Sequence, residues 1–146
     1  MAEDKKNYIF TVGKRKESVA RLRLYSSIVN LDLGDEKIKK GDIIVNGKKA
    51  SEYFSGLVSK SVYEEPLRLT NNLDKYALTV KVEGGGQHGQ LDAMVHALSR
   101  ALSKIDVKNK QILKKNGFLT RDARVRERRK VGMGGKARRK RQSPKR

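Results

Sequence analysis

The sequence contains no cysteine, no tryptophan and only two histidines among its 146 residues. Without cysteine the chain has no disulfide, no thiolate metal ligand and no thiol nucleophile, and such a composition is typical of a reducing compartment. His88 and His96 lie eight residues apart, with no cysteine and no paired acid at ligand spacing, which makes them a poor metal site. We therefore expect neither a bound metal nor a cofactor.

Long apolar runs are also missing. No segment approaches the roughly 18 consecutive apolar residues of a membrane-spanning helix. The opening residues MAEDKKNYIF lack the apolar stretch of a signal peptide, and their acids argue against a transit peptide. The chain is therefore expected to be a soluble, cytoplasmic protein with no membrane partner.

Acids are scarce relative to bases. The chain has 35 Lys or Arg and 16 Asp or Glu, a formal net charge of +19 and a pI near 10.3. Residues 121–146 hold 13 of these bases and two acids, so this stretch alone carries +11. An excess of this size predicts a polyanionic partner such as RNA or DNA.

The same carboxyl-terminal stretch has too little apolar material to fold by itself. It contains no aromatic residue, and its few apolar residues are alanine, valine and one methionine besides glycine. Ordering the backbone costs roughly 1–2 kcal/mol per residue, so we expect this stretch to take shape only when a polyanion supplies the energy. Its arginines suit phosphate, which a guanidinium binds with two parallel hydrogen bonds. The sequence thus predicts a globular domain over 1–120 and a basic arm over 121–146.

Hydrophobic periodicity predicts an α+β domain, a small sheet with helices on one face. In SVARLRLYS, apolar residues alternate with Arg21 and Arg23, which indicates a half-buried strand with a basic outer face. LDAMVHALSRAL repeats apolar residues at helical spacing, with Asp92 and His96 on its polar side as an expected surface pair. The expected strands are 8–13, 18–26, 43–47 and 75–84, and the expected helices are 50–58, one from about 90 to 103, and 108–117.

Several residues predict where these elements begin or end. We expect a turn at 14–17 and another at Asn46-Gly47, a strong turn dipeptide. Ser51 is a candidate helix cap, Pro66 is expected to end the segment before it, and Gly117 is expected to stop the last helix.

Gly84, Gly86 and Gly89 spell G-x-G-x-x-G between a predicted strand and a predicted helix, as in a dinucleotide-binding loop. However, Gln90 and Leu91 follow where a phosphate-binding loop needs Lys and Ser or Thr. The acid at the distance of a ribose-binding residue lies between two helices, and too little chain remains for a doubly wound sheet. We expect a tight turn with positive φ at one or more glycines. A place for an RNA phosphate on the backbone amides stays open.

No spacing of Ser, His and Asp supports a catalytic site, so we expect no enzyme. The charge alone would also fit a free-standing, histone-like protein that binds nucleic acid without sequence preference. A cationic protein of the membrane surface fits less well, because the arm has no apolar face to insert.

Five blocks of the sequence are distinctive: GKRKESVARLRL, VNGKKASEYF, EPLRLT, VEGGGQHGQLDAMVHALSRAL and LKKNGFLTRDARVRERRKVGMGGKARRKRQSPKR. In this order they resemble the ninth protein of the small ribosomal subunit, in its bacterial type. The resemblance implies a two-layer α/β sandwich with a left-handed β-α-β crossover, followed by an extended basic arm. It also implies a structural role in the head of the small subunit. The implied partners are rRNA, neighbouring ribosomal proteins and tRNA in the peptidyl site.

The arm's charge and the resemblance together predict which residues bind RNA. Lys145 and Arg146, at the tip of the arm, are expected to lie near the tRNA. The predicted rRNA-binding residues are Lys14, Arg15, Lys16, Arg21, Arg100, Arg121, Arg124, Arg126, Arg128, Arg129, Lys130, Lys136, Arg138, Arg139, Lys140 and Arg141.

The chain departs from the family pattern in two places. The family commonly ends Gln-Phe-Ser-Lys-Arg, whereas this chain has Ser143 and Pro144 before the final pair. The aromatic residue is therefore lost, and proline stiffens the approach to the tip. The connection 26–42 is longer than usual and is either a surface loop or a different route to the strand that begins near residue 43.

Overall fold

Strands and helices are mixed along the chain. The computed structural model describes residues 8–26, 32–33, 36–126, 128 and 131. The α+β class is confirmed within these ranges. The elements are β1 (Tyr8–Arg15), β2 (Ser18–Tyr25), β3 (Asp32–Leu33), β4 (Glu36–Lys37), β5 (Ile43–Val45), β6 (Lys48–Lys49), α1 (Ala50–Tyr53), α2 (Leu57–Leu69), β7 (Ala77–Glu83), α3 (Gln87–Ile105) and α4 (Val107–Lys115).

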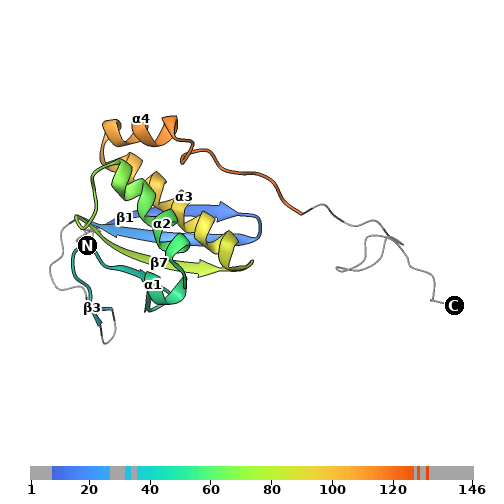
Figure 1. Ribbon diagram of the computed structural model, residues 1–146, viewed down its shortest axis with the longest axis horizontal. Helices are drawn as coiled ribbons and strands as arrows, with labels where there is room; N and C mark the ends of the chain where they lie inside the picture. The colour runs from blue at the N-terminus through green and yellow to red at the C-terminus, as the bar shows by residue number, and fades with distance from the viewer. Residues whose placement is uncertain (1–7, 27–31, 34–35, 127, 129–130, 132–146) are drawn as a thin grey trace, which may run out of the picture.

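In the described ranges, five strands form one mixed sheet in the order β1-β2-β7-β5-β6 (Figure 1). Its neighbours are antiparallel except for β5 and β7, which are parallel. Because a hairpin cannot join parallel strands, the chain crosses from β5 to β7 through α1 and α2. This is the β-α-β connection that the resemblance implies. The short strands β3 and β4 pair separately, within the long connection before β5.

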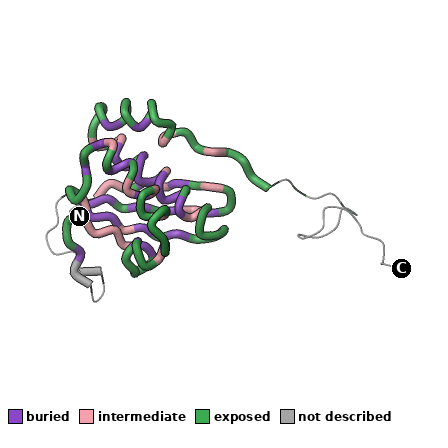
Figure 2. Tube along the Cα trace, viewed as in Figure 1, coloured by how far each residue is buried: buried purple, intermediate pink, exposed green. Residues whose placement is uncertain are grey.

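Helices cover one face of the sheet (Figure 1). Along β2, Leu22 and Leu24 are fully buried on the helix side, while Arg21 and Arg23 are exposed on the other. Figure 2 shows that buried residues gather in the strands and in α3. The alternation therefore separates a hydrophobic core from a basic outer face, as the period of two predicts.

The long helix α3 packs directly on β1 and β2. Met94, Leu98 and Leu102 on this helix are fully buried, and each side chain of this kind contributes about 1.5–3 kcal/mol on burial. Thr11 of β1 donates a buried hydrogen bond from its hydroxyl to the carbonyl of Ala97, at 2.8 Å. These contacts fix the position of α3 over the first hairpin.

The first hairpin turns over two residues rather than the predicted four. Lys14 and Arg15 belong to β1, because they pair with the first residues of β2. Lys16 and Glu17 form the turn, with Lys16 at φ 50°. The two cations before the turn are therefore held on a strand, and their spacing is set by the pleat.

Asn46-Gly47 forms the predicted turn between β5 and β6. Both residues have positive φ, 49° and 79°, which matches the type I′ turn that this dipeptide favours. The Asn46 amide also donates to the carbonyl of Val82 at 3.0 Å and accepts from its N–H at 2.9 Å. The hairpin is thereby fastened to β7.

The chain after this hairpin is more helical than predicted. Ser51 lies inside the four-residue helix α1 and does not cap it, since the N-cap is Lys49. The prediction that Pro66 ends its segment is wrong, because Pro66 lies inside α2. Burial of Pro66 and Leu67 against the core outweighs the hydrogen bond that proline removes. The carbonyl of Pro66 also accepts a hydrogen bond from the Thr70 hydroxyl at 2.8 Å.

The described chain ends its regular structure with α4. Asp106 caps this helix by accepting from the N–H of Lys108 at 3.0 Å, and Gly117 at φ 79° follows its end, as predicted. Residues 121–126 contain no helix or strand and lead away from the domain (Figure 1). Apart from residues 128 and 131, the rest of the predicted arm lies outside the described residues. Among the helices in the described ranges, none has the length and apolar character needed to cross a bilayer.

Candidate nucleic-acid interface

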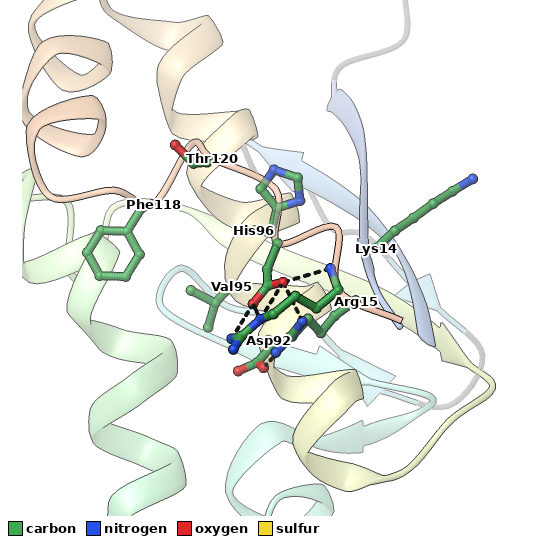
Figure 3. A pocket seen from close by; sticks show the side chains of 9 residues that line it. Lys14, Arg15, Asp92, Val95, His96, Phe118 and Thr120 are labelled. Atoms are coloured by element: carbon green, nitrogen blue, oxygen red, sulfur yellow. Dashed lines mark hydrogen bonds and ion pairs between the residues drawn. The ribbon is translucent and has the colours of Figure 1, made fainter. Parts of the chain in front are cut away.

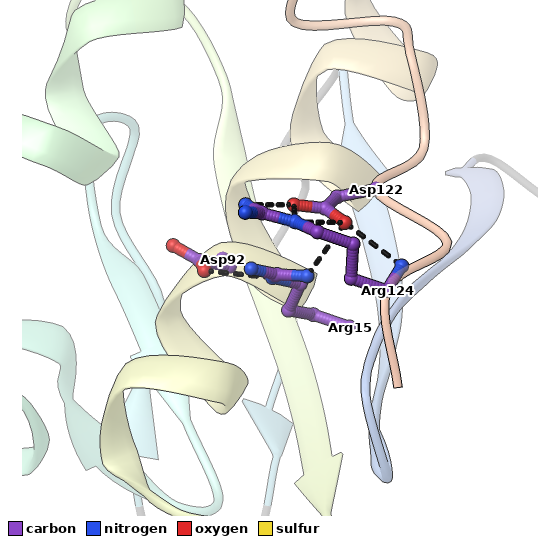
Figure 4. Close-up of polar contacts among 4 residues, drawn as sticks. All are labelled: Arg15, Asp92, Asp122 and Arg124. Carbon is purple, nitrogen blue, oxygen red and sulfur yellow. Dashed lines mark hydrogen bonds and ion pairs between the residues drawn. The ribbon is translucent and has the colours of Figure 1, made fainter. Parts of the chain in front are cut away.

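Four charged side chains connect β1, α3 and the first residues of the arm; we call Arg15, Asp92, Asp122 and Arg124 the arm anchor (Figure 4). The Nε of Arg15 lies 3.2 Å from a carboxylate oxygen of Asp92, and its Nη1 lies 2.8 Å from one of Asp122. Arg124 contacts the other oxygen of Asp122 at 2.7 Å. The Arg15 side chain is only 14% exposed. Arg15 therefore ties the root of the arm to the domain.

Asp122 also organises the chain around itself. Its carboxylate accepts from the backbone N–H of Arg124 at 2.9 Å and from the Nε of the same residue at 3.0 Å. These bonds to Arg124, together with the charge of Arg15, hold the pKa of Asp122 well below its usual range. Asp122 in turn raises the pKa of Arg124. Asp122 and Arg124 thus each favour the charged form of the other.

His96 lies half-buried beside the chain that leaves α4 (Figure 3). Burial lowers the pKa of His96, the backbone hydrogen bond with Leu119 opposes this, and the charges of Arg100 and Arg121 lower it further. The predicted pairing of His96 with Asp92 is wrong, because Asp92 pairs with Arg15 instead. The lowered pKa favours the neutral form of His96, which packs at the junction of domain and arm.

A shallow depression lies beside the arm anchor (Figure 3). Its two carboxylates, Asp92 and Asp122, already face arginines, and the described residues contain no group of three His, Cys, Asp or Glu able to hold a metal. The depression is therefore a structural junction between oppositely charged groups. Its lining residues are Lys14, Arg15, Asp92, Val95, His96, Phe118, Thr120, Asp122 and Arg124.

The predicted RNA-binding residues of the domain differ in whether the fold places a carboxylate beside their charge. Lys14 and Lys16 are exposed at the first hairpin and form no ion pair with any described carboxylate. Arg15, by contrast, is enclosed by the arm anchor, and Arg21 pairs with Glu83 at 2.8 Å. The hairpin lysines are therefore the cations most open to phosphate in this part of the domain.

Arg100 of α3, another predicted RNA-binding residue, reaches the outer edge of β1. It donates to the carbonyl of Val12, and Lys104, one turn later on α3, donates to the carbonyl of Phe10 at 3.1 Å. Unpaired carbonyls on an edge strand invite pairing with another chain, and charged side chains block this. Arg100 thus has a structural role in the protein without RNA.

The glycine loop is a close-packed turn, as predicted. Gly84 and Gly85 have positive φ, 74° and 62°. A methyl group on Gly85 or Gly89 would lie 2.1 or 2.7 Å from the hydroxyl oxygen of Ser18, the first residue of β2. That hydroxyl donates to the carbonyl of Gly84 at 3.1 Å. The glycines therefore let the start of α3 approach the first hairpin.

The basic surface of α4 was not among the predicted RNA-binding residues. Only Asn109 and Leu113 of this helix are buried, and no described carboxylate pairs with its lysines. The run KNKQILKK, which has four lysines and no acid, is the sequence signal that marks this surface. Its exposed cations are Lys108, Lys110, Lys114 and Lys115.

The arm residues are only partly described. Arg121, Arg124, Arg126 and Arg128 are exposed in the described chain. The other predicted arm residues lie outside the described residues: Arg129, Lys130, Lys136, Arg138, Arg139, Lys140, Arg141, Lys145 and Arg146.

Most of the sequence matches a known family. The sequence profile described as ribosomal protein S9/S16 matches residues 13–146. The chain is also similar to the small ribosomal subunit protein uS9 of Maridesulfovibrio salexigens. The two are 42% identical over 130 residues, which cover 89% of this chain and 91% of that protein. The similarity thus includes both the domain and the basic segment after it.

Proposed function

This chain belongs to the ribosomal protein S9/S16 family, and from that membership we propose that its domain and arm bind rRNA in the head of the small subunit. The family gives the chain a structural, non-enzymatic role in the small ribosomal subunit, which confirms the prediction that it is no enzyme. Its location is the ribosome, and its partners are rRNA and other ribosomal proteins. We further propose that the tip of the arm lies near tRNA in the peptidyl site.

The observation that carries this proposal is the uneven distribution of acids along the chain relative to its bases. Inside the domain, Arg15 and Arg21 face carboxylates of the same chain. Beyond Thr120 the chain has 13 bases and only two acids, so the acids of this stretch can balance no more than two of its positive charges. RNA phosphates supply the missing negative charge, and the release of their counterions favours binding.

The division into a domain over 1–120 and an arm over 121–146 fits this mechanism. Ordering 26 residues costs roughly 25–50 kcal/mol, at 1–2 kcal/mol each. Many simultaneous phosphate contacts are needed to offset this cost, so the arm takes its final shape along folded rRNA. The arm anchor fixes the start of the arm on the domain. The free arm therefore has fewer conformations, and it loses less conformational entropy when it binds.

Sedimentation of native extract tests the function against its main rival. We expect the protein to migrate with small ribosomal subunits and to stay there at moderate salt. Migration with the nucleoid or chromatin would instead indicate the histone-like, free-standing protein that the charge alone also allows. Crosslinking of Arg146 to RNA in the isolated subunits would then identify what the tip touches.

Deleting Lys145 and Arg146 is expected to leave assembly intact and to weaken tRNA binding in the peptidyl site. A charge-assisted contact contributes about 1.5–3 kcal/mol, so the loss of one contact corresponds to about tenfold in affinity or more. The measurement is tRNA affinity of purified subunits that carry the shortened protein.

A control of equal charge replaces Lys48 and Lys75 with glutamine, because these exposed lysines of the domain are not among the predicted RNA-binding residues. This control is expected to leave the tRNA affinity close to that of the unchanged protein. Equal tRNA affinity in the deletion and in the unchanged protein would contradict the proposed place of the tip.

A further inference from the structure

The sheet face opposite the helices carries a groove that contains an exposed aromatic residue. Phe10, on β1, is 46% exposed. Among the large hydrophobic side chains that are exposed in the described residues, it is the single aromatic one. The groove runs past it over β2, β7 and β5, where Arg23, Ile44 and Lys81 also line it. A partner that covers the groove would gain free energy from burying the exposed part of this ring.

The charges in this groove are predominantly positive. Glu83 is the one described carboxylate there, and it faces two cations, Arg21 at 2.8 Å and Lys81 at 3.4 Å. The guanidinium of Arg23 lies over the ring of Tyr8, 5.3 Å from its centre, and pairs with no described carboxylate. With three cations and one acid, the groove attracts a negatively charged ligand.

Two cations lie next to Phe10 itself. Arg23 is its direct partner across the β1–β2 ladder. Lys104 reaches the other side of β1 and donates to the Phe10 carbonyl at 3.1 Å. Phe10 thus has one cation beside it on β2 and another at the open edge of β1.

We propose that an unpaired stretch of rRNA crosses this face, with one base stacked on Phe10 and its phosphates beside Arg23 and Lys81. Single-stranded RNA brings both a flat π surface and a regular series of negative charges, so it matches the ring and the cations together. Stacking tolerates any base, which suits a groove that has few groups for reading base edges. This inference rests on the proposed rRNA-binding function and assigns it a second surface, separate from the arm.

Photocrosslinking in assembled subunits tests the occupant of the groove. Benzoylphenylalanine in place of Phe10 is expected to crosslink to an rRNA nucleotide that lies outside the base-paired helices. The same probe in place of Leu57, which is 87% exposed on α2, controls for general surface proximity. Crosslinks from position 10 to another ribosomal protein, or no crosslink at all, would overturn the inference.

Affinity measurements with the full chain test the stacking. The probe is a transcript of the head domain of small-subunit rRNA. Phe10→Leu keeps an apolar side chain but removes the ring, and we expect a loss of about 5- to 150-fold, the range for one stacked base. Phe10→Tyr is expected to restore affinity to within about twofold. Equal affinity for Phe10→Leu and the unchanged chain would overturn the stacking.

Salt dependence separates the ring from the charges. Log affinity falls with log salt, and Phe10→Leu is expected to leave the slope of this fall unchanged. Arg23→Gln should make the slope shallower by about 0.7, the value for one phosphate of a single strand. If the unchanged chain fails to bind the transcript, the proposed function fails with it. If it binds but Arg23→Gln has no effect on the slope, the groove alone is rejected.

Discussion

At the scale of single residues, Gly13 shows most clearly how closely the helix and the sheet approach. A Cβ at this position would lie 2.0 Å from the carbonyl oxygen of Ala93 and 2.6 Å from the nitrogen of Ala97. Both atoms are backbone atoms of α3, so no side-chain movement can make room. β1 and α3 can therefore approach this closely only because residue 13 has no side chain.

We expect Gly13→Ala to destabilise the protein by about 1–3 kcal/mol or more, since overpacking forces the backbone to shift. Chemical denaturation of the purified chain measures this. Gly86→Ala is the matched control, because Gly86 has an extended backbone and no atom within 4 Å of an added Cβ. A loss at Gly13 no larger than that at Gly86 would show that α3 can move away without cost.

His96 predicts a dependence of stability on pH. Its pKa in the folded chain is lowered by burial, while in the unfolded chain it lies near the ordinary value of about 6.5. As pH falls through about 6.5, the unfolded chain takes up a proton that the folded chain resists, so the free energy of unfolding decreases. The stabilisation by neutral His96 is present above this pH and is lost below the folded pKa.

Thermal unfolding at pH 7.5 and at pH 5 is expected to show this decrease, and His96→Gln is expected to reduce it. The exposed His88 on the same helix provides the control: His88→Gln should keep the full pH dependence. An unchanged dependence in His96→Gln would mean that other groups cause it.

At the scale of elements, the arm anchor decides where the arm leaves the domain. Arg15 is the residue through which the arm root reaches both β1 and α3, by way of Asp122 and Asp92. We expect Arg15→Gln to accelerate amide hydrogen exchange in residues 121–126, because their contact with the domain is lost. Lys16→Gln, which removes a neighbouring charge that forms no described ion pair, should leave their exchange unchanged. Equal exchange in both variants would show that the arm root is held by other contacts.

The elements also show where local sequence rules are sufficient. Strand β2 and helix α3 were predicted correctly, because their apolar spacing repeats over many residues. The helix α2 was missed, because Pro66 is a strong local stop signal. The helix tolerates Pro66 because Tyr63, Pro66 and Leu67 are buried against the rest of the domain. This burial exists only in the packed structure.

At the scale of the whole molecule, we propose that residues 1–120 fold without the arm. The buried hydrophobic residues of the described chain all precede residue 120. A chain that ends at Thr120 is therefore expected to keep a cooperative thermal transition by circular dichroism, although it loses Asp122 and Arg124. The same truncated chain should bind rRNA more weakly and with a smaller salt dependence. A melt without a cooperative transition would mean that the domain needs the arm to fold.

Net charge, its concentration after residue 120 and the apolar spacing of the strands and helices were sufficient to predict an α+β domain with a polyanionic partner. These properties add up along the chain and do not depend on which residues meet in space. The pairing of particular charges was not predictable in this way. Arg15 and Asp92 are 77 positions apart, and a fold must first bring β1 beneath α3 before the two can meet. The tertiary structure therefore decided which cations meet a carboxylate within the domain and which, such as Arg23 and the lysines of α4, face no described carboxylate, since an ion pair requires its partners to lie within a few ångströms.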